Sequence, residues 1–262
     1  MPTQQQQKKN IVIDPERLLP VEAVLEALLQ SKRAGDLRKG REIRMLVDQL
    51  MADGWHGRVR LLGFHPVAGR ALAAIVSLAT PGLVWDGTQP LPAGEPFLMA
   101  ITIPYYYPKA GLSVKFIGSS IPWCPHVVHP DQRFQPALRD LAPELQEMLR
   151  EGAGHCCYAR DSELTGEPAP NGDLNVLIYS VAAIVSLQQY WGEAGTLNPL
   201  ALGHAKEFGA VNGPSLPYPV AGTNGAAIMP AIAVESAGDT EQEDDFKYID
   251  DDESEQGGNE NA

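Results

Sequence analysis

Helical spacing of apolar residues marks the beginning of the folded part of the chain. The stretch LLPVEAVLEALLQ repeats this spacing, so one helical face carries Val21, Val24, Leu25, Leu28 and Leu29. Gly35 and Gly40 then punctuate the chain, and REIRMLVDQLMADG repeats the helical spacing until Gly54, a residue type that often ends helices. The pattern therefore predicts N-terminal helices within residues 11–57.

Short apolar segments bounded by Gly and Pro follow, and they are typical of strands. They are RVRLLGFHPV, ALAAIVSLAT and EPFLMAITIPYYYP. In LSVKFIGSS, the apolar Leu112, Val114 and Phe116 alternate with Ser113 and Lys115. This period of two indicates a strand that is buried on one face only.

Helical patterns return in the second half of the chain. ALRDLAPELQEMLREG predicts a helix that is interrupted near Pro143, because proline breaks the helical hydrogen-bond ladder. LNVLIYSVAAIVSLQQYW is apolar on nearly every face, so it predicts a buried helix. The order of helices, strands and helices predicts an α+β fold built on a meander of antiparallel strands.

Charge changes this picture only at the C-terminal end. The chain has 262 residues and a formal net charge of −13, but residues 235–262 hold 12 acidic residues and one lysine. That segment therefore carries −11, and the rest of the chain carries only −2. We expect a disordered N-terminus at 1–10, helices at 11–57, a catalytic domain at 58–208, and a Gly/Pro-rich linker with a disordered acidic tail at 209–262. The acidic tail and the absence of a dense basic stripe argue against nucleic-acid binding.

Cysteine content and hydropathy bear on the cellular compartment. Three cysteines in 262 residues are too few for a disulfide framework, which favours the reducing cytosol. The N-terminal sequence has no apolar run of signal-peptide length, and no stretch approaches the roughly 20 apolar residues of a membrane span. We therefore expect a cytoplasmic protein without a membrane partner.

The stretch YYYPKAGLSVKF resembles the core of ubiquitin-conjugating enzymes. In that family a strand ends in Tyr-Pro, as at Tyr107-Pro108, and a valine and a phenylalanine follow on the next strand, as at Val114 and Phe116. Gly111-Leu112 stands where the family usually has two prolines. The resemblance covers roughly residues 58–208 and implies a fold like that of ubiquitin-conjugating enzymes.

Two further motifs carry the resemblance to the active site. His129-Pro130-Asp131 is similar to the family's His-Pro-Asn motif, with aspartate in place of asparagine. The family's catalytic cysteine commonly lies three residues after a glycine, and in GHCCY this spacing from Gly154 selects Cys157. A helical insertion separates His129 from Cys157. Divergence of this kind is similar to bacterial ubiquitin-conjugating-like proteins from ubiquitin-like modification and anti-phage operons.

The resemblance implies a transferase that accepts a ubiquitin-like protein as a thioester on Cys157. Its implied partners are an adenylating, ubiquitin-activating-like enzyme, the ubiquitin-like protein itself and a protein target. It implies no cofactor for this chain, because the activating enzyme uses the ATP. His126, His129 or a backbone N–H would stabilise the oxyanion, since ionised Asp131 cannot donate a hydrogen bond. Asp131 and Asp161 are candidates for steering the acceptor amine.

A free cysteine is most often a small buried apolar residue, and we expect Cys156 to be one. Three alternatives to a transferase also stay open. A zinc site would draw ligands from Cys124, His126, His129, His155, Cys156 and Cys157, although the C-x₂-C spacing is missing. A Cys-His hydrolase would use His126 or His129 as its base. The third alternative is a non-catalytic module of the same fold that only binds a ubiquitin-like protein.

Overall fold

A computed structural model describes residues 17–67, 71–107, 111–158, 174–188 and 196–216 of the chain. Contacts within the chain divide it into two compact units, Met1–Thr223 and Asn224–Ala262. All described residues belong to the first unit. The acidic tail and Asp161 lie outside the described residues, so the expectations for them remain predictions from the sequence.

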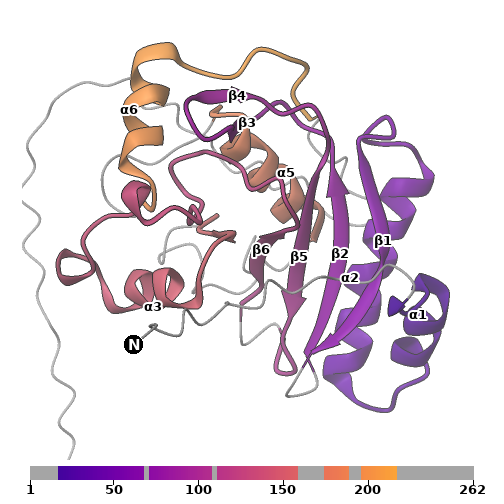
Figure 1. The fold of residues 1–262 in the computed structure, drawn as a ribbon. Helices are drawn as coiled ribbons and strands as arrows, with labels where there is room; N and C mark the ends of the chain where they lie inside the picture. Colours follow the sequence, from indigo (N-terminus) through magenta and orange to yellow (C-terminus); the bar gives the residue numbers. More distant parts are fainter. Residues whose placement is uncertain (1–16, 68–70, 108–110, 159–173, 189–195, 217–262) are drawn as a thin grey trace, which may run out of the picture. The chain divides into compact units, whose positions relative to one another are not determined.

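An antiparallel sheet organises this unit, and its strands are neighbours in chain order (Figure 1). The strands are β1 (Val59–Val67), β2 (Ala71–Leu78), β5 (Phe97–Ile103), β6 (Ser113–Ile117) and β7 (His155–Cys156). Every pair in the order β1-β2-β5-β6-β7 is antiparallel. The predicted α+β class with a strand meander is thereby confirmed.

Alternation within the strands sets the two faces of the sheet. In β5, buried and partly exposed positions alternate along the whole strand. In β6, Val114 and Phe116 are buried whereas Ser113 is exposed, as the sequence pattern predicts. Pro66 lies in β1, an edge strand, where its missing N–H leaves no gap in the interior of the sheet.

A small second sheet, not predicted from the pattern, follows β2. Its strands are β3 (Leu83–Trp85) and β4 (Pro90–Pro92), which pair in antiparallel fashion. Asp86 shapes the turn, because its carboxylate accepts hydrogen bonds from the N–H groups of Thr88 and Gln89 at 2.7 and 2.8 Å. The hairpin brings Trp85 against Trp123, with ring centroids 5.7 Å apart.

Helices α1 (Val21–Leu29) and α2 (Ala34–Met51) contact the β1 side of the sheet (Figure 1). Gly35 and Gly40 do not interrupt the chain as the sequence suggested, since both lie inside α2. A Cβ at Gly40 would come within 2.9 Å of the Leu29 side chain and 3.3 Å of Leu28 Cβ. Gly40 therefore permits the close approach of the two helices.

Helix α5 (Leu174–Val185) supplies much of the main core. Nine of its twelve residues are buried, which confirms the buried helix predicted from its apolar sequence. Ile178, Val181 and Ile184 belong to the same apolar cluster as Met99, Ile101 and Phe116 of the sheet. The sheet and α5 thus form two layers around one core.

The remaining elements belong to the second half of the chain, where α3 (Pro143–Glu151) contacts β7. The short 3₁₀ turns η3 (Gln132–Phe134) and η4 (Leu138–Asp140) precede helix α3 (Pro143–Glu151). Pro143 is the first residue of α3, which confirms the interruption predicted there. Helix α6 (Pro199–Phe208) begins after Asn198, whose side-chain oxygen accepts a hydrogen bond from Ala201 N at 3.1 Å.

Residues 209–216, which composition assigns to the linker, make specific contacts. Val211 N donates to Ser186 O at 2.9 Å, and Leu216 is buried. The Arg58 guanidinium donates to the carbonyl oxygens of Pro214 and Ser215. This part of the chain is therefore packed on the end of α5 and the start of β1.

Candidate functional site

The predicted nucleophile lies on the cysteine segment, which we define as residues 154–157. Along one edge this segment pairs with β6, where Cys156 faces Val114 and His155 faces Lys115. Along its other edge, Cys157 N donates to His126 O at 2.9 Å. Backbone pairing on both sides thus holds the cysteines in a fixed register between β6 and the histidine-containing loop.

Gly154 makes this register possible. Its φ of +90° is rarely adopted by residues with a side chain, and a Cβ at this position would lie 2.1 Å from Phe116 O. Gly154 O also accepts a hydrogen bond from Phe116 N at 2.8 Å. The close contact with β6 therefore requires a glycine at position 154. This is the glycine whose three-residue spacing selected Cys157 as the predicted nucleophile.

Successive residues of an extended segment point to opposite sides, and the two cysteines follow this rule. Cys156 is 2% exposed and belongs to the main core beneath the sheet. Cys157 is partly exposed and packs against a separate apolar cluster formed by Val128, Leu149 and Leu197. The expectation that Cys156 is a buried apolar residue is confirmed, whereas a catalytic role of Cys157 remains a prediction.

Burial also separates the cysteines chemically. Desolvation raises the pKa of Cys156 well above its ordinary value and that of Cys124 to about 12. Both residues are therefore thiols, not thiolates, at neutral pH, and they are poor nucleophiles. Among the three cysteines, only Cys157 is partly exposed to solvent.

The two histidines of the loop are both buried. His126 is 0% exposed and lies beside Cys157 through the hydrogen bond of its carbonyl oxygen. His129 is 5% exposed, and its ring packs edge-on against Phe134 with centroids 4.8 Å apart. Burial lowers the pKa of His129 against the opposing influence of Asp131. Their packing gives both residues a structural role, and the predicted catalytic roles remain predictions.

Asp131 is engaged by Arg133. Its carboxylate caps η3 by accepting from Arg133 N at 3.0 Å, and it also accepts from the guanidinium. These hydrogen bonds hold the pKa of Asp131 at about 2, so it is ionised at neutral pH and donates no hydrogen bond. Asp131 N donates to Nδ1 of His129 at 3.1 Å. The loop thus brings His129 and Asp131 together.

Sequence reasoning considered His155 only as a possible zinc ligand and missed its pairing with Glu151. His155 Nε2 lies 3.0 Å from the Glu151 carboxylate at the end of α3. Burial and the nearby Lys115 ammonium lower the pKa of His155 to about 4. The imidazole is therefore neutral at neutral pH, and its Nε2–H donates to Glu151. The sequence did contain a signal for His155, because alternate residues of an extended segment point to the same side and residues 155 and 157 are two apart.

Asn198 is the second polar residue that sequence reasoning did not assign to the site. It is 0% exposed, and its Nδ2 has no hydrogen-bond partner within the part of the chain that the structure describes. The N–H groups of Leu197 and Asn198 both donate to Pro125 O, at 2.8 and 3.0 Å. Asn198 therefore lies one residue from the Leu197 side chain that packs against Cys157.

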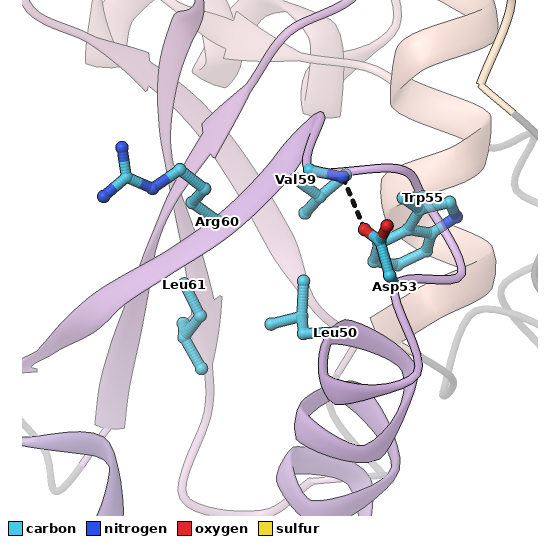
Figure 2. A pocket seen from close by; sticks show the side chains of 7 residues that line it. Leu50, Asp53, Trp55, Val59, Arg60 and Leu61 are labelled. Atoms are coloured by element: carbon cyan, nitrogen blue, oxygen red, sulfur yellow. Dashed lines mark hydrogen bonds between the residues drawn. The ribbon is translucent and has the colours of Figure 1, made fainter.

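A shallow pocket lies at the corner between α2 and β1, and Figure 2 shows its lining residues. Leu50, Val59 and Leu61 supply its apolar wall, and Asp53 accepts a hydrogen bond from Gly57 N at 2.7 Å. Its volume of about 220 Å³ is below the roughly 300–1,000 Å³ of typical ligand pockets. It borders β1, the strand at the opposite edge of the sheet from β7.

Comparison with protein-family models, curated proteins and solved structures finds no match for this chain. Within the described residues, no three His, Cys, Asp or Glu side chains lie close enough together to hold a metal ion. No helix in that part of the chain is long and apolar enough to cross a membrane.

Proposed function

We propose that this protein is a ubiquitin-conjugating-like transferase that carries a ubiquitin-like protein as a thioester on Cys157. The observation that carries the proposal is the contrast between the cysteines, because only Cys157 is accessible while Cys124 and Cys156 are buried. An acyl group received from an activating enzyme needs an accessible thiol in a fixed position. Backbone pairing on both edges of the cysteine segment supplies that position.

The surroundings of Cys157 also suit the transfer step. Polar groups lie in or near the cysteine segment: His155 belongs to it, His126 accepts a hydrogen bond from Cys157 N, and Asn198 follows Leu197, which packs against Cys157. Such groups can stabilise the charge that develops on the thioester oxygen and can manage the proton of the acceptor. The partners are an adenylating enzyme, a ubiquitin-like protein and a protein target, and the setting suggested by the resemblance is a bacterial anti-phage system.

The test is conjugate formation with an activating enzyme, ATP and a ubiquitin-like protein. Wild-type protein should give a conjugate that reducing agents cleave, and Cys157→Ala should give none. Cys157→Ser should form a conjugate more slowly, because a hydroxyl is a weaker nucleophile, and its ester should resist thiols. Cys156→Ala is the matched control and should keep the activity. A conjugate on Cys156 would contradict the assignment.

A second candidate function is a cysteine hydrolase, and the contact between His155 and Glu151 favours it. Such hydrolases use a cysteine as nucleophile, a histidine as base and a carboxylate that orients the histidine. In that case water, not an amine, would release the acyl group from Cys157. Discharge of a preformed thioester at a rate independent of added amine would support the hydrolase. A binding module, in contrast, would keep its function in Cys157→Ala.

A further inference from the structure

The side of the cysteine segment that faces α3 carries more than one reactive group. His155 contacts Glu151, the last residue of α3, at 3.0 Å. Cys157 packs on the cluster that includes Met148 and Leu149 of the same helix. Cys156, between them, packs into the main core. His155 and Cys157 therefore lie on one side of the segment, roughly 6–7 Å apart along an extended backbone.

The hydrogen bond to Glu151 decides which imidazole nitrogen is available. Because the neutral ring donates Nε2–H to the carboxylate, Nδ1 carries the lone pair. Nδ1 has no hydrogen-bond partner among the described residues. The His155 side chain is 14% exposed and Glu151 is 50% exposed, so the pair borders solvent.

We propose that His155 is the general base of this site, with Nδ1 taking the proton of the acceptor amine that attacks the thioester on Cys157. Glu151 is the positioning residue, because it fixes the orientation and the tautomer of the ring. This inference rests on the proposed function and adds the group that makes the acceptor reactive. It also assigns a role to a residue that neither the Cys-His hydrolase reading nor the family resemblance selected.

The chemical step balances without a further reactant. The amine nitrogen attacks the thioester carbonyl carbon, so a C–N bond forms and the C–S bond breaks. The nitrogen gives one proton to Nδ1 of His155, and the imidazolium returns it to the departing sulfur of Cys157. A thioester and an amine thereby become an amide and a thiol.

Electrostatics keeps the base ready for this step. The pKa of about 4 means that nearly every His155 ring is unprotonated at neutral pH. Two charged groups face the ring from the elements beside it, Lys115 on β6 and Glu151 on α3. Lys115 disfavours the imidazolium, and the Glu151 carboxylate stabilises it when it forms during the transfer. The proton is therefore held only briefly.

The test uses the full-length protein and bypasses the unidentified modifier. Cys157 is loaded by exchange with a glycine-terminated peptide thioester, which reaches an accessible thiol but not the buried ones. Discharge is then followed by mass spectrometry with two acceptors, free lysine and hydroxylamine. A lysine amine must lose a proton as it attacks the thioester and therefore gains from a positioned base, whereas hydroxylamine is largely unprotonated at neutral pH and reacts with thioesters without one.

We expect His155→Gln to slow discharge to lysine on the order of 10²-fold, the usual contribution of a positioned base, and to change discharge to hydroxylamine little. Glu151→Gln should give a smaller loss with the same selectivity for lysine. The matched controls are Glu147→Gln, on the exposed side of α3, and His65→Gln, on β1 at the far edge of the sheet. Both controls should behave as wild type.

A folded His155→Gln protein that discharges to lysine at the wild-type rate overturns the inference. If that variant does not fold, the comparison of Glu151→Gln with Glu147→Gln decides, and equal rates for these two also overturn it. Failure of the proposed function gives a different result. In that case the activating enzyme never loads Cys157, while the peptide thioester still discharges in a manner that depends on His155.

Discussion

The two sides of the cysteine segment differ in what surrounds them. The side that carries Cys156 faces the main core, next to its strand partner Val114 and in the same apolar cluster as Phe116 of β6 and the buried residues of α5. The side that carries Cys157 faces a small apolar cluster and the polar end of α3. The two adjacent cysteines thus have different surroundings: Cys156 lies in the apolar core, and Cys157 lies at a partly exposed site with polar neighbours.

The difference shows how one backbone feature can assign separate tasks to neighbouring residues. Pairing with β6 and with the loop fixes the segment, and the period of two then turns each side chain to one side or the other. Burial suppresses the reactivity of one thiol, and exposure keeps the other accessible. Substitutions in the segment and in the loop beside it should therefore affect stability to different degrees.

The largest expected effect comes from Gly154→Ala. A methyl group there would lie 2.1 Å from Phe116 O on a backbone with φ of +90°, so the pairing with β6 must break. We expect the free energy of unfolding to fall by at least about 4 kcal/mol. Chemical denaturation checks this, and near-wild-type stability would show that the segment is not held as described.

Gly152→Ala is the matched control for that substitution. Gly152 also has a positive φ, +98°, but a Cβ there would meet no atom within 4 Å. The expected loss is the backbone strain alone, roughly 1–3 kcal/mol. The difference between the two alanine variants therefore isolates the collision with β6.

Acid should destabilise the protein through His155. Its pKa in the folded state is about 4, against an ordinary value of 6.5, so the unfolded chain binds more protons between these pH values. This contribution to stability is fully present above about pH 6.5, declines as the pH falls, and is lost below about pH 4. Its size is on the order of 2–3 kcal/mol.

Urea denaturation at pH 7 and at pH 4 measures this contribution. Wild-type protein should lose more stability between the two values than His155→Gln, because the variant has no ring to protonate. His65→Gln, on the opposite edge of the sheet, should lose as much as wild type. Equal losses in wild type and His155→Gln would show that His155 is solvated in the folded state.

Serine substitutions compare the two thiols directly. Cys156→Ser places a hydroxyl in the apolar core, and we expect a cost of about 1–3 kcal/mol if it remains without a partner. Cys157→Ser exposes its hydroxyl to water and should cost less. Thermal unfolding of the two variants tests this order, and a larger loss at Cys157 would reverse the assignment of the two sides.

The smallest expected effect belongs to Asp131→Asn. Asp131 pairs with Arg133, whose side chain is 72% exposed, so solvent and salt screen the interaction. The low pKa of Asp131 contributes stability that is present above about pH 3.8 and is lost as the pH falls through about 2. Because solvent screens the pair, Asp131→Asn should lose only a little of this stability at pH 7. A clear loss of transfer rate without loss of stability would instead support the steering role implied by the resemblance.

Local sequence patterns were sufficient for several elements of the fold. The alternation in β6 predicted which residues are buried, because in a strand the period of two follows from backbone geometry. The apolar sequence of α5 predicted its burial, and Pro143 predicted the break before α3. Alternation also predicts that the two adjacent cysteines point to opposite sides, and the resemblance to ubiquitin-conjugating enzymes selected Cys157 as the exposed one.

Other features depended on segments that are distant in the sequence. Gly40 seemed to interrupt a helix, but the packing of α1 against α2 explains it, and no local pattern records that contact. The hairpin β3–β4 is too short to give a periodic signal. Likewise, Asn198 lies beside the site only because Pro125 O accepts hydrogen bonds from residues 197 and 198.

The sequence by itself determined the class of the fold, the burial of α5 and the opposite directions of Cys156 and Cys157, because each follows from the periodicity of a single segment. Only the tertiary structure decided that Glu151 contacts His155 and that Arg133 forms an ion pair with Asp131. The contacts of a polar side chain depend on which groups the fold brings within hydrogen-bond distance. Spacing along the chain does not specify that distance.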